Sequence, residues 1–360
     1  MVYISKIKQV GYGLGFGGTN AKLTKITSKH KLAINFLIKK QLCNFIDTSP
    51  EYANGNSEKL IGKLSSSEKK NIFISTKVSP ENLNYDNFIN SVKQSLKRLK
   101  IKKIDLIQPH WPNYDVDNDE IIAAFKFLKK KGKVRFFGLS NFDLIDIKYF
   151  KSRLRTDFKF IQEEYSLNDR TIEDTKIKYC EKNNLKIICY SPLGSGNLIL
   201  NTEQKNLLSK ISFEKNIPFY SVALGYLINK SKNLILIPHS TNLNNIYTNS
   251  KLSHFKMLKK DSLEIDKKFN TKMLKVKLKN IIFFDKNYKK IRNLQDAKEN
   301  KYNLSPSPIQ LSKKILQGSK LKPIKVRKKQ KKLYLSEGRL RFWAYVIAYG
   351  WNYSIKVILK

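Results

Sequence analysis

The chain has few of the residues on which disulfide-rich, metal-binding and membrane proteins depend. Its three cysteines, Cys43, Cys180 and Cys189, form neither a CxxC motif nor a metal-ligand spacing, which indicates a reduced, cytoplasmic protein. The apolar runs fall far short of the roughly 20 residues of a membrane span, and the N-terminus lacks the apolar stretch of a signal peptide. Glycine and proline occupy only 25 of 360 positions, whereas 41% of the residues are hydrophobic, so a globular core is expected.

Acidic residues are scarce relative to basic ones. The 29 Asp and Glu against 70 Lys and Arg give a formal net charge of +41. Only 9 of the basic residues are arginine, the residue that suits phosphate and base recognition best, and 61 lysines are spread along the whole chain. We therefore interpret the positive charge as that of lysines spread over the solvent-exposed surface. Such a field still favours loose, salt-sensitive polyanion binding, so a nucleic-acid partner stays open but is not favoured.

Short β-rich segments recur between residues 10 and 240, and amphipathic segments separate them. Strands are expected at residues 10–15, 44–49, 71–78, 103–110, 134–141, 160–166, 186–192 and 233–240. Helical periodicity is found at residues 86–99, 118–131, 174–183 and 204–214. Eight apolar strands with helical crossovers predict an α/β fold, a (β/α)₈ TIM barrel, which should close with a helix near residues 255–268.

Polar side chains stand at the carboxyl ends of these strands. They are Asp47, Lys77, His110, Ser140, Asn141, Gln162, Tyr190 and Ser240. In a parallel barrel these ends converge on one mouth, where the catalytic loops lie. A merely solvated surface would scatter polar residues over both ends of the strands. The pattern therefore predicts a functional site at this mouth.

An alternative interpretation starts from the glycines at residues 13–18, which match the dinucleotide-binding pattern GxGxxG. However, Asp47 stands 29 residues after Gly18, where that fingerprint expects an acidic residue at about 20. The corresponding sheet would also need about six strands rather than eight. We expect instead that the glycines bring the backbone of the first strand close to a ligand.

Four of the polar residues suggest a catalytic group. A free tyrosine with a pKa of ~10 is a poor acid at neutral pH. An ammonium about 4 Å away favours the phenolate by up to roughly 4 kcal/mol, and two pKa units need only about 2.7 kcal/mol. Lys77 is thus expected to lower the pKa of Tyr52 and make it a general acid, while Asp47 holds Lys77 and His110 orients a carbonyl. Taken alone, Asp47 could equally be a helix N-cap and His110 a half-buried structural histidine. Their combination at three strand ends favours catalysis.

With these residues in this order, the sequence resembles the aldo-keto reductase family. The matching stretches, in family order over about residues 8–265, are FIDTSPEYANGNSEKLIGK, IFISTKV, SLKRLKIKKIDLIQPHWPN, GKVRFFGLSN, IQEEYS, CYSPLGSGNL and LIPHST. The resemblance implies a TIM barrel over residues 1–268 that reduces an aldehyde or ketone, sugar-like substrates included, with a nicotinamide cofactor and no metal. Tyr52 would be the general acid, Lys77 and Asp47 would tune it, and His110 would position the small-molecule carbonyl.

The resemblance also implies a cofactor site. Ser140, Asn141 and Gln162 correspond to partners of the nicotinamide carboxamide, and Tyr190 to the aromatic ring beneath the nicotinamide. The loop after Tyr190 would wrap the pyrophosphate through Ser191, Leu193, Gly194, Ser195 and Gly196.

The end of the eighth strand departs from the pattern of NADPH-preferring relatives. These usually carry lysine after the IP of that strand and arginine six residues later, whereas this chain has His239 and Asn245. Ser240 and Asn249 stay as expected phosphate and adenine contacts. NADP(H) is expected as the family default, with NAD(H) as the alternative.

Residues 275–360 begin a different pattern, which predicts a small α+β domain. Strands are expected within 276–285, 322–329 and 351–359, a helix at 308–318, and a strand, turn and helix at 332–350, with Trp343 and Trp351 in the core. This part resembles the ParB/sulfiredoxin-like family, whose GxxR turn binds phosphate. The resemblance implies a nucleotide or other phosphate ligand at Gly338 and Arg341. Because Arg339 occupies the family's acidic position, binding is favoured over hydrolysis; the alternative is that Arg341 pairs with a surface carboxylate.

The sequence therefore predicts a cytoplasmic, nicotinamide-dependent carbonyl reductase fused to a phosphate-binding module. Two alternatives stay open. One is a regulatory protein that senses the nicotinamide redox state and binds a nucleotide or DNA through its C-terminal domain. The other is a reductase for a sugar or nucleotide-linked sugar that the C-terminal domain helps to recruit.

Overall fold

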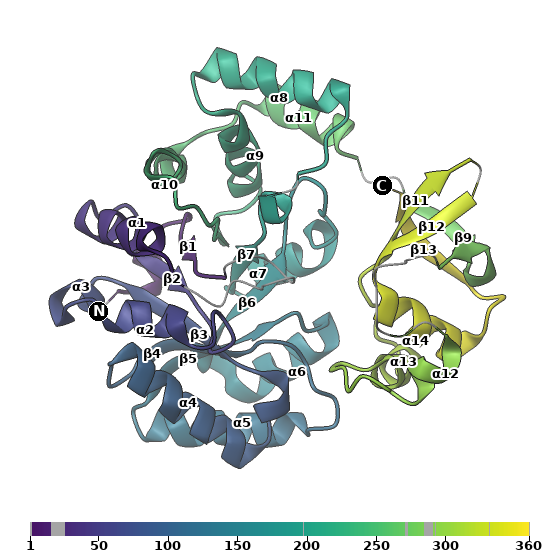
Figure 1. Cartoon of the computed structure of the whole chain (residues 1–360), viewed down its shortest axis with the longest axis horizontal. Helices are drawn as coiled ribbons and strands as arrows, with labels where there is room; N and C mark the ends of the chain where they lie inside the picture. The colour runs from purple at the N-terminus through teal and green to yellow at the C-terminus, as the bar shows by residue number, and fades with distance from the viewer. Residues whose placement is uncertain are drawn as a thin grey trace. The chain divides into compact units, whose positions relative to one another are not determined.

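The computed structural model describes residues 2–15, 26–196, 198–270, 273–283, 291, 293–330 and 332–359. The chain forms two units, which are both drawn in Figure 1. The first unit consists of Met1–His110, Val116–Asn141 and Tyr149–Phe269. The second consists of Trp111–Asp115, Phe142–Lys148 and Asn270–Lys360.

The first unit is the predicted parallel barrel. Its eight strands lie in sequence order: β1 (Tyr12–Gly13), β2 (Phe45–Asp47), β3 (Phe73–Val78), β4 (Ile104–Pro109), β5 (Val134–Ser140), β6 (Phe158–Glu164), β7 (Lys186–Tyr190) and β8 (Leu234–Leu236). A parallel bridge between Val10 and Leu236 joins the first strand segment to the last. The amide of Gly11 also donates to the carbonyl of Leu236 over 2.8 Å, so the sheet closes on itself.

Helices surround these strands, as Figure 1 shows. They are α1 (Ser28–Lys39), α2 (Asn56–Gly62), α3 (Ser66–Lys70), α4 (Tyr85–Leu99), α5 (Asn118–Lys130), α6 (Leu144–Leu154), α7 (Lys178–Lys182), α8 (Thr202–Lys215), α9 (Phe219–Ile228), α10 (Leu243–Lys251) and α11 (Lys259–Lys268). Helix α4 illustrates the local logic. The Asn84 side chain caps its first turn, Phe88 and Val92 are fully buried on one stripe, and the helix ends at Lys100 in the left-handed conformation.

The interior of the barrel changes from apolar to polar along the strands. An apolar cluster contains Phe45, Phe73, Leu106, Phe160 and Ile188. Because side chains two residues apart point to the same side of a strand, the next inward positions are Asp47, Ser75, Gln108, Gln162 and Tyr190. The register places Asp47 opposite Ser75 and Ser140 opposite Gln162. A polar layer therefore forms near the carboxyl ends of the strands.

A polar network fastens the closing helix α11 to the rest of the barrel. The Asp266 carboxylate of α11 accepts hydrogen bonds from Arg170, from the Tyr226 hydroxyl (2.5 Å) and from the Lys230 ammonium (2.8 Å). Arg170 also donates two bonds of 2.8 Å to Glu173. The helix predicted near the end of the barrel is thus present and is tied to α9 and to the segment before α7.

The second unit contains a five-stranded sheet and helices, and its assignment as a ParB/sulfiredoxin-like domain stays a prediction. The strand order is β10-β12-β11-β13-β9, with β9 (Met273–Lys277), β10 (Ile281–Ile282), β11 (Ile324–Lys329), β12 (Lys332–Glu337) and β13 (Ser354–Leu359). The helices of this part are α12 (Leu294–Lys298), α13 (Pro308–Leu316) and α14 (Arg339–Tyr349). Its core gathers Ile324, Val326, Phe342, Trp343 and Val357.

Two expectations for the second unit were wrong in detail. Residues 276–285 do not form one strand, because β9 and β10 lie at opposite edges of the sheet and a 3-10 turn, Leu278–Asn280, separates them; residues 284 and 285 lie outside the described residues. Trp343 is buried, but Trp351 is 42% exposed. Trp351 follows the turn at Gly350, so its ring packs against the edge of Trp343, with centroids 5.7 Å apart.

Candidate active site

The polar layer brings Asp47 and Lys77 into a buried ion pair. Asp47 ends β2 opposite Ser75 of β3, and Lys77 lies two residues further along that strand on the same side. The Lys77 Nζ donates to Asp47 Oδ2 over 2.6 Å and to the Thr48 carbonyl over 2.9 Å. Both residues are only 1% exposed. Asp47 is therefore no helix cap but the counter-ion of a buried ammonium.

Tyr52 lies over this pair, in the segment between β2 and α2. The Lys77 Nζ is 5.0 Å from the centre of the tyrosine ring. Gly15 is also close to the ring: a Cβ at that position would be 3.2 Å from Tyr52 Cζ, which is closer than ordinary contact. The glycine backbone approaches the ring of Tyr52 here, and the predicted approach to a ligand stays a prediction. Gly17 and Gly18 of the glycine motif lie outside the described residues.

The direction of the Tyr52 pKa corrects the expectation from sequence. Burial raises the pKa of Tyr52, the Lys77 charge lowers it and the Asp47 charge raises it, and the net direction is upward. Burial likewise lowers the pKa of Lys77, but Asp47 and Tyr52 outweigh burial, so the net direction is again upward. The sequence argument counted the ammonium and left out desolvation. Tyr52 thus holds its proton and Lys77 its charge in this site at neutral pH.

His110 follows β4 and meets Tyr52 edge-on. The ring centroids are 5.6 Å apart at an interplanar angle of 79°. The backbone of His110 is held on both sides, because its amide donates to the Val78 carbonyl over 2.8 Å and its carbonyl accepts from Asn141 Nδ2 over 3.1 Å. The structure thus brings all four predicted catalytic residues to one end of the barrel.

Sequence reasoning missed a carboxylate next to this group. Glu51 Oε2 is 2.8 Å from His110 Nδ1, and the Ser49 hydroxyl is 3.4 Å from the same nitrogen. Glu51 directly precedes Tyr52, inside the densest polar cluster of the sequence. That position was the only signal available, since nothing in the local pattern says which way its side chain turns.

The residues predicted to hold the nicotinamide fall into two sets. Ser140, Asn141 and Tyr190 form a cluster, in which Asn141 Nδ2 donates to Ser140 Oγ over 3.0 Å and the Tyr190 hydroxyl donates to Asn141 Oδ1 over 2.8 Å. Gln162 belongs instead with the Asp47–Lys77 ion pair. Its Nε2 donates to Asp47 Oδ2 over 3.1 Å, and its Oε1 accepts from Gln108 Nε2 over 2.8 Å. Gln108 is a second residue that the sequence reasoning did not assign.

The barrel and its polar mouth agree with comparisons to known proteins. The model of the Aldo/keto reductase family matches residues 11–270. The chain belongs to this family. It is accordingly an NAD(P)-dependent oxidoreductase, which the similarity to named reductases also supports.

Two curated relatives and one solved structure illustrate the similarity of this aldo-keto reductase to known ones. Methylglyoxal reductase YeaE of Escherichia coli (strain K12) is 27% identical over 230 residues, which cover 62% of this chain and 79% of the relative. The NADH-specific methylglyoxal reductase of the same organism is 29% identical over 192 residues, or 47% of this chain and 58% of that protein. The thermostable aldo-keto reductase Tm1743, crystallised with the inhibitor epalrestat, is 27% identical with a TM-score of 0.65 over 72% of this chain and 95% of that one.

The loop after β7 of this aldo-keto reductase carries the predicted pyrophosphate contacts. It contains a 3-10 turn, Gly194–Gly196, and Ser191 and Ser195 both have positive φ, with their hydroxyls 2.8 Å apart. At Gly196 a Cβ would meet nothing within 4 Å. The backbone here is open to a ligand, and the role of Ser191, Leu193, Gly194, Ser195 and Gly196 stays a prediction.

The residues after β8 pack around the first strand. His239 Nδ1 lies 3.1 Å from the Gly13 carbonyl, and its ring stacks on His30 with centroids 5.6 Å apart. Desolvation by these neighbours lowers the pKa of His239 to about 4, although part of the residue is exposed. Ser240 and Asn249 line one small cavity together with Tyr12. At neutral pH His239 is therefore an uncharged group at the place where NADPH-preferring relatives carry lysine.

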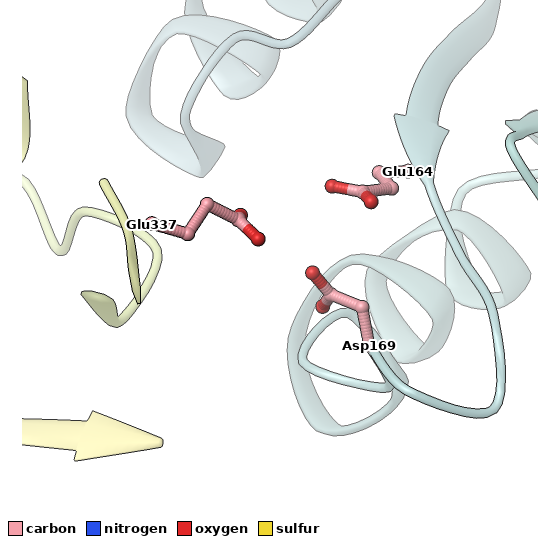
Figure 2. A group of neighbouring side chains, drawn as sticks. All are labelled: Glu164, Asp169 and Glu337. Carbon is pink, nitrogen blue, oxygen red and sulfur yellow. The ribbon is translucent and has the colours of Figure 1, made fainter. Parts of the chain in front are cut away.

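Two further acidic residues lie at the end of β6 and in the turn after it, and Figure 2 draws them. Glu164 is the last residue of β6, and Asp169 lies in the following turn, where its Oδ1 accepts from the Thr171 hydroxyl over 2.8 Å. Glu337, the third side chain in Figure 2, belongs to the second unit. We assign no cation site to these carboxylates.

Within the described part of the chain, no helix is long and apolar enough to cross a membrane.

The predicted phosphate residues of the second unit lie at the start of α14. Gly338 has a φ of +95° and precedes the helix, as the GxxR interpretation requires. Arg341 Nη1, however, donates to the carbonyls of Lys322 (2.6 Å) and Pro323 (3.0 Å), and its Nη2 lies 3.8 Å from Glu337. The arginine thus ties α14 to the segment before β11. Its proximity to Glu337 matches the structural alternative, and phosphate binding stays a prediction.

Proposed function

We propose that the barrel reduces the carbonyl group of a small aldehyde or ketone, with Tyr52 as the proton donor. The observation that carries the proposal is the joint placement of three groups at one barrel end. The Lys77 ammonium lies 5.0 Å from the Tyr52 ring centre and is paired with buried Asp47, and the His110 ring meets Tyr52 edge-on. A phenol, an ammonium and an imidazole in this arrangement suit proton transfer to a developing alkoxide.

Each residue has a distinct task in this mechanism. A bound, reduced nicotinamide supplies the hydride to the carbonyl carbon. Tyr52 donates its proton to the carbonyl oxygen, and the Lys77 charge stabilises the phenolate that remains. Asp47 holds Lys77 in place and balances its charge in a site that excludes water. His110 donates a hydrogen bond that orients the carbonyl oxygen next to Tyr52.

The described residues fit a nicotinamide cofactor. Asn141 and Ser140 offer an amide and a hydroxyl beside the Tyr190 ring, which suits a carboxamide on an aromatic ring. The open glycine backbone at Gly194–Gly196 suits a pyrophosphate. Several similar solved structures contain NADPH or NADP, and one similar curated protein is named as NADH-specific. We propose NADP(H) or NAD(H) as the cofactor of this chain, bound at these residues.

Methylglyoxal is the first substrate to test, since two relatives are named as methylglyoxal reductases. Sugar aldehydes are the second class of substrate to test.

We also propose that the protein is located in the reducing cytoplasm, which its three buried and free cysteines support.

The test is the substitution Tyr52→Phe, which removes only the phenolic oxygen. We expect kcat for methylglyoxal or glyceraldehyde to fall by about 10²–10⁴-fold, the usual contribution of a general acid. The cofactor dissociation constant, measured by fluorescence titration, should stay within about two-fold of that of the unmodified chain. Reduction at an unchanged rate by the variant would refute the assignment of Tyr52.

We also propose that the second unit, as a ParB/sulfiredoxin-like domain, binds a phosphate ligand at Gly338 and Arg341. The support is the helix start at Gly338 with Arg341 beside it. Calorimetry of the full chain with pyrophosphate tests this. Arg341→Lys keeps the charge but loses the planar fork and should weaken binding about tenfold, while Arg327→Lys on an exposed part of β11 should not. The absence of any binding heat, or equal binding by both variants, would contradict the proposal.

A further inference from the structure

The carboxylate of Glu51 is bonded to the histidine of the proposed active site. Glu51 Oε2 is 2.8 Å from His110 Nδ1, whereas the other close neighbour of that nitrogen, the Ser49 hydroxyl, is at 3.4 Å. The Glu51 side chain is 42% exposed and that of His110 only 12%. A half-exposed carboxylate therefore reaches inward to a largely buried imidazole.

Glu51 is ionised in this arrangement. Burial raises its pKa, but the hydrogen bond and the charge interaction with His110 outweigh burial, and the net direction of the Glu51 pKa is downward. An ionised carboxylate only accepts hydrogen bonds. His110 Nδ1 must therefore carry a proton and donate it to Glu51.

This constraint decides what the other ring nitrogen can do. A neutral imidazole has a single N–H, so a neutral His110 with its proton on Nδ1 leaves a lone pair on Nε2. That lone pair cannot donate to a carbonyl oxygen. Only the imidazolium, which carries protons on both nitrogens, can bond Glu51 through Nδ1 and a carbonyl oxygen through Nε2.

We propose that Glu51 is a positioning residue that keeps His110 as an imidazolium, so that Nε2–H donates to the substrate carbonyl. This inference rests on the proposed function. The proton that ends on the product oxygen comes from Tyr52, and the hydride from the reduced nicotinamide. His110 keeps both of its protons and polarises the carbonyl without giving one up.

The other groups around His110 do not replace this role. Tyr52 meets the ring edge-on and is uncharged when protonated. Behind it, Lys77 and Asp47 form a pair of opposite charges 2.6 Å apart. Asn141, from the end of β5, contacts the His110 carbonyl and is uncharged. Glu51 is thus the negative charge in direct contact with the imidazole among the described residues.

The first experiment compares the pH dependence of kcat/KM for carbonyl reduction in the unmodified chain and in Glu51→Gln. The amide has nearly the shape of the carboxylate but no charge, and its nitrogen can donate to Nδ1, which lets a neutral His110 keep its single proton on Nε2. The alkaline limb, which is the loss of kcat/KM when the imidazolium of the unmodified chain gives up a proton, should therefore be at least about tenfold smaller in the variant, whereas the two proteins should have similar kcat/KM at acid pH. A uniform loss at all pH values, or an unchanged profile, would overturn the proposal.

The matched control is Glu203→Gln on α8. Glu203 also forms an ion pair, with Lys268 over 2.7 Å, but it is 71% exposed and lies outside the site. This variant should reproduce the unmodified pH profile. If it shifted the limb equally, the effect would belong to overall charge and the proposal would fail.

A second measurement needs neither substrate nor cofactor. The chain has only four histidines, so nitrogen NMR shows four imidazole rings with two nitrogen signals each, and His110→Asn identifies the pair that belongs to His110. We expect both His110 nitrogens to be protonated to a higher pH in the unmodified chain than in Glu51→Gln. An identical titration in the two proteins would refute the role of Glu51. A chain that reduces no carbonyl would instead refute the proposed function and leave this readout intact.

Discussion

Removing the charge of Lys77 tests whether the Asp47–Lys77 pair is as tightly coupled as its burial implies. The substitution Lys77→Met keeps a side chain of similar length in a position that is 1% exposed. Asp47 then retains the hydrogen bonds from the Ser75 hydroxyl (3.0 Å) and Gln162 Nε2 (3.1 Å), but it loses its counter-ion. A buried carboxylate without an opposite charge is strongly unfavourable.

The magnitude follows from the distance of 2.6 Å between Lys77 Nζ and Asp47 Oδ2. At an effective dielectric constant near 20, the Coulomb attraction at that distance is about 6 kcal/mol. Structural relaxation and water entry reduce the measured cost of breaking such a pair to about 3–5 kcal/mol. We expect Lys77→Met and Asp47→Asn each to lower the free energy of unfolding by about that amount. The double variant should lose only about 0–2 kcal/mol, because it leaves no unpaired charge.

The assay is a double-mutant cycle measured by urea unfolding with circular dichroism detection. The control is Lys178→Met, which removes an ammonium from an exposed ion pair with Asp174 and should leave the urea midpoint unchanged. The reasoning is refuted if the two single effects add in the double variant within about 0.5 kcal/mol. It is also refuted if Lys77→Met lowers the free energy of unfolding by less than about 1 kcal/mol, since so small an effect is typical of an ion pair that is exposed to water.

Three other predictions follow from the described contacts. Asp266→Asn removes the charge that holds α11. Burial raises the Asp266 pKa, but the hydrogen bonds from Lys230 and its other partners lower it overall, so the carboxylate stabilises the fold above the usual carboxyl pKa and this stabilisation is lost as the pH falls. The difference between the unfolding temperatures at pH 7 and pH 3 should therefore be smaller in the variant than in the unmodified chain. Gly138→Ala should lower the free energy of unfolding by about 1–3 kcal/mol in a urea titration, because its Cβ would lie 2.7 Å from a backbone oxygen of β6; an unchanged midpoint would contradict this. The double substitution His239→Lys and Asn245→Arg should tighten NADPH binding relative to NADH by at least about tenfold in fluorescence titrations, since it adds two cationic partners for the 2′-phosphate. If the ratio of the NADPH and NADH dissociation constants were unchanged, the 2′-phosphate would bind elsewhere.

The barrel was predictable because its signal is local and repeated. Each strand is a short apolar run, and each of several runs ends in a polar residue, as β2 ends in Asp47 and β5 in Ser140. Parallel register then brings those ends together without further information. The same argument placed Lys77 near Asp47: Asp47 lies opposite Ser75 of the neighbouring strand, and Lys77 follows two residues later on the same side of that strand.

The details that escaped prediction depend on how side chains turn and how far they are buried. The contact between Glu51 and His110 depends on the path of the segment after β2, for which the residue pattern carries no period. The Tyr52 pKa moved opposite to expectation because desolvation, which a linear sequence does not show, outweighs a visible lysine. Gln162 bonds Asp47 because the barrel interior is narrow enough for β6 to reach β2.

The second unit shows the limit of pattern reasoning more clearly. The glycine and arginine spacing of a phosphate-binding turn is present at Gly338 and Arg341, and the helix begins where it should. The same arginine nevertheless donates to two backbone carbonyls of the segment before β11. A motif fixes which residues are near a turn, but competing acceptors in the tertiary structure decide what the side chain binds.

In the proposed mechanism, the raised pKa of Tyr52 also bears on the direction of the reaction. A proton donor for carbonyl reduction must be protonated before the reaction and must tolerate a negative charge afterwards. Burial supplies the first condition, since it disfavours the phenolate of Tyr52 in the resting site. The Lys77 ammonium supplies the second, because it is already in place, held by Asp47, when the charge appears. The same groups would serve alcohol oxidation less well at neutral pH, because that direction requires the phenolate at the start.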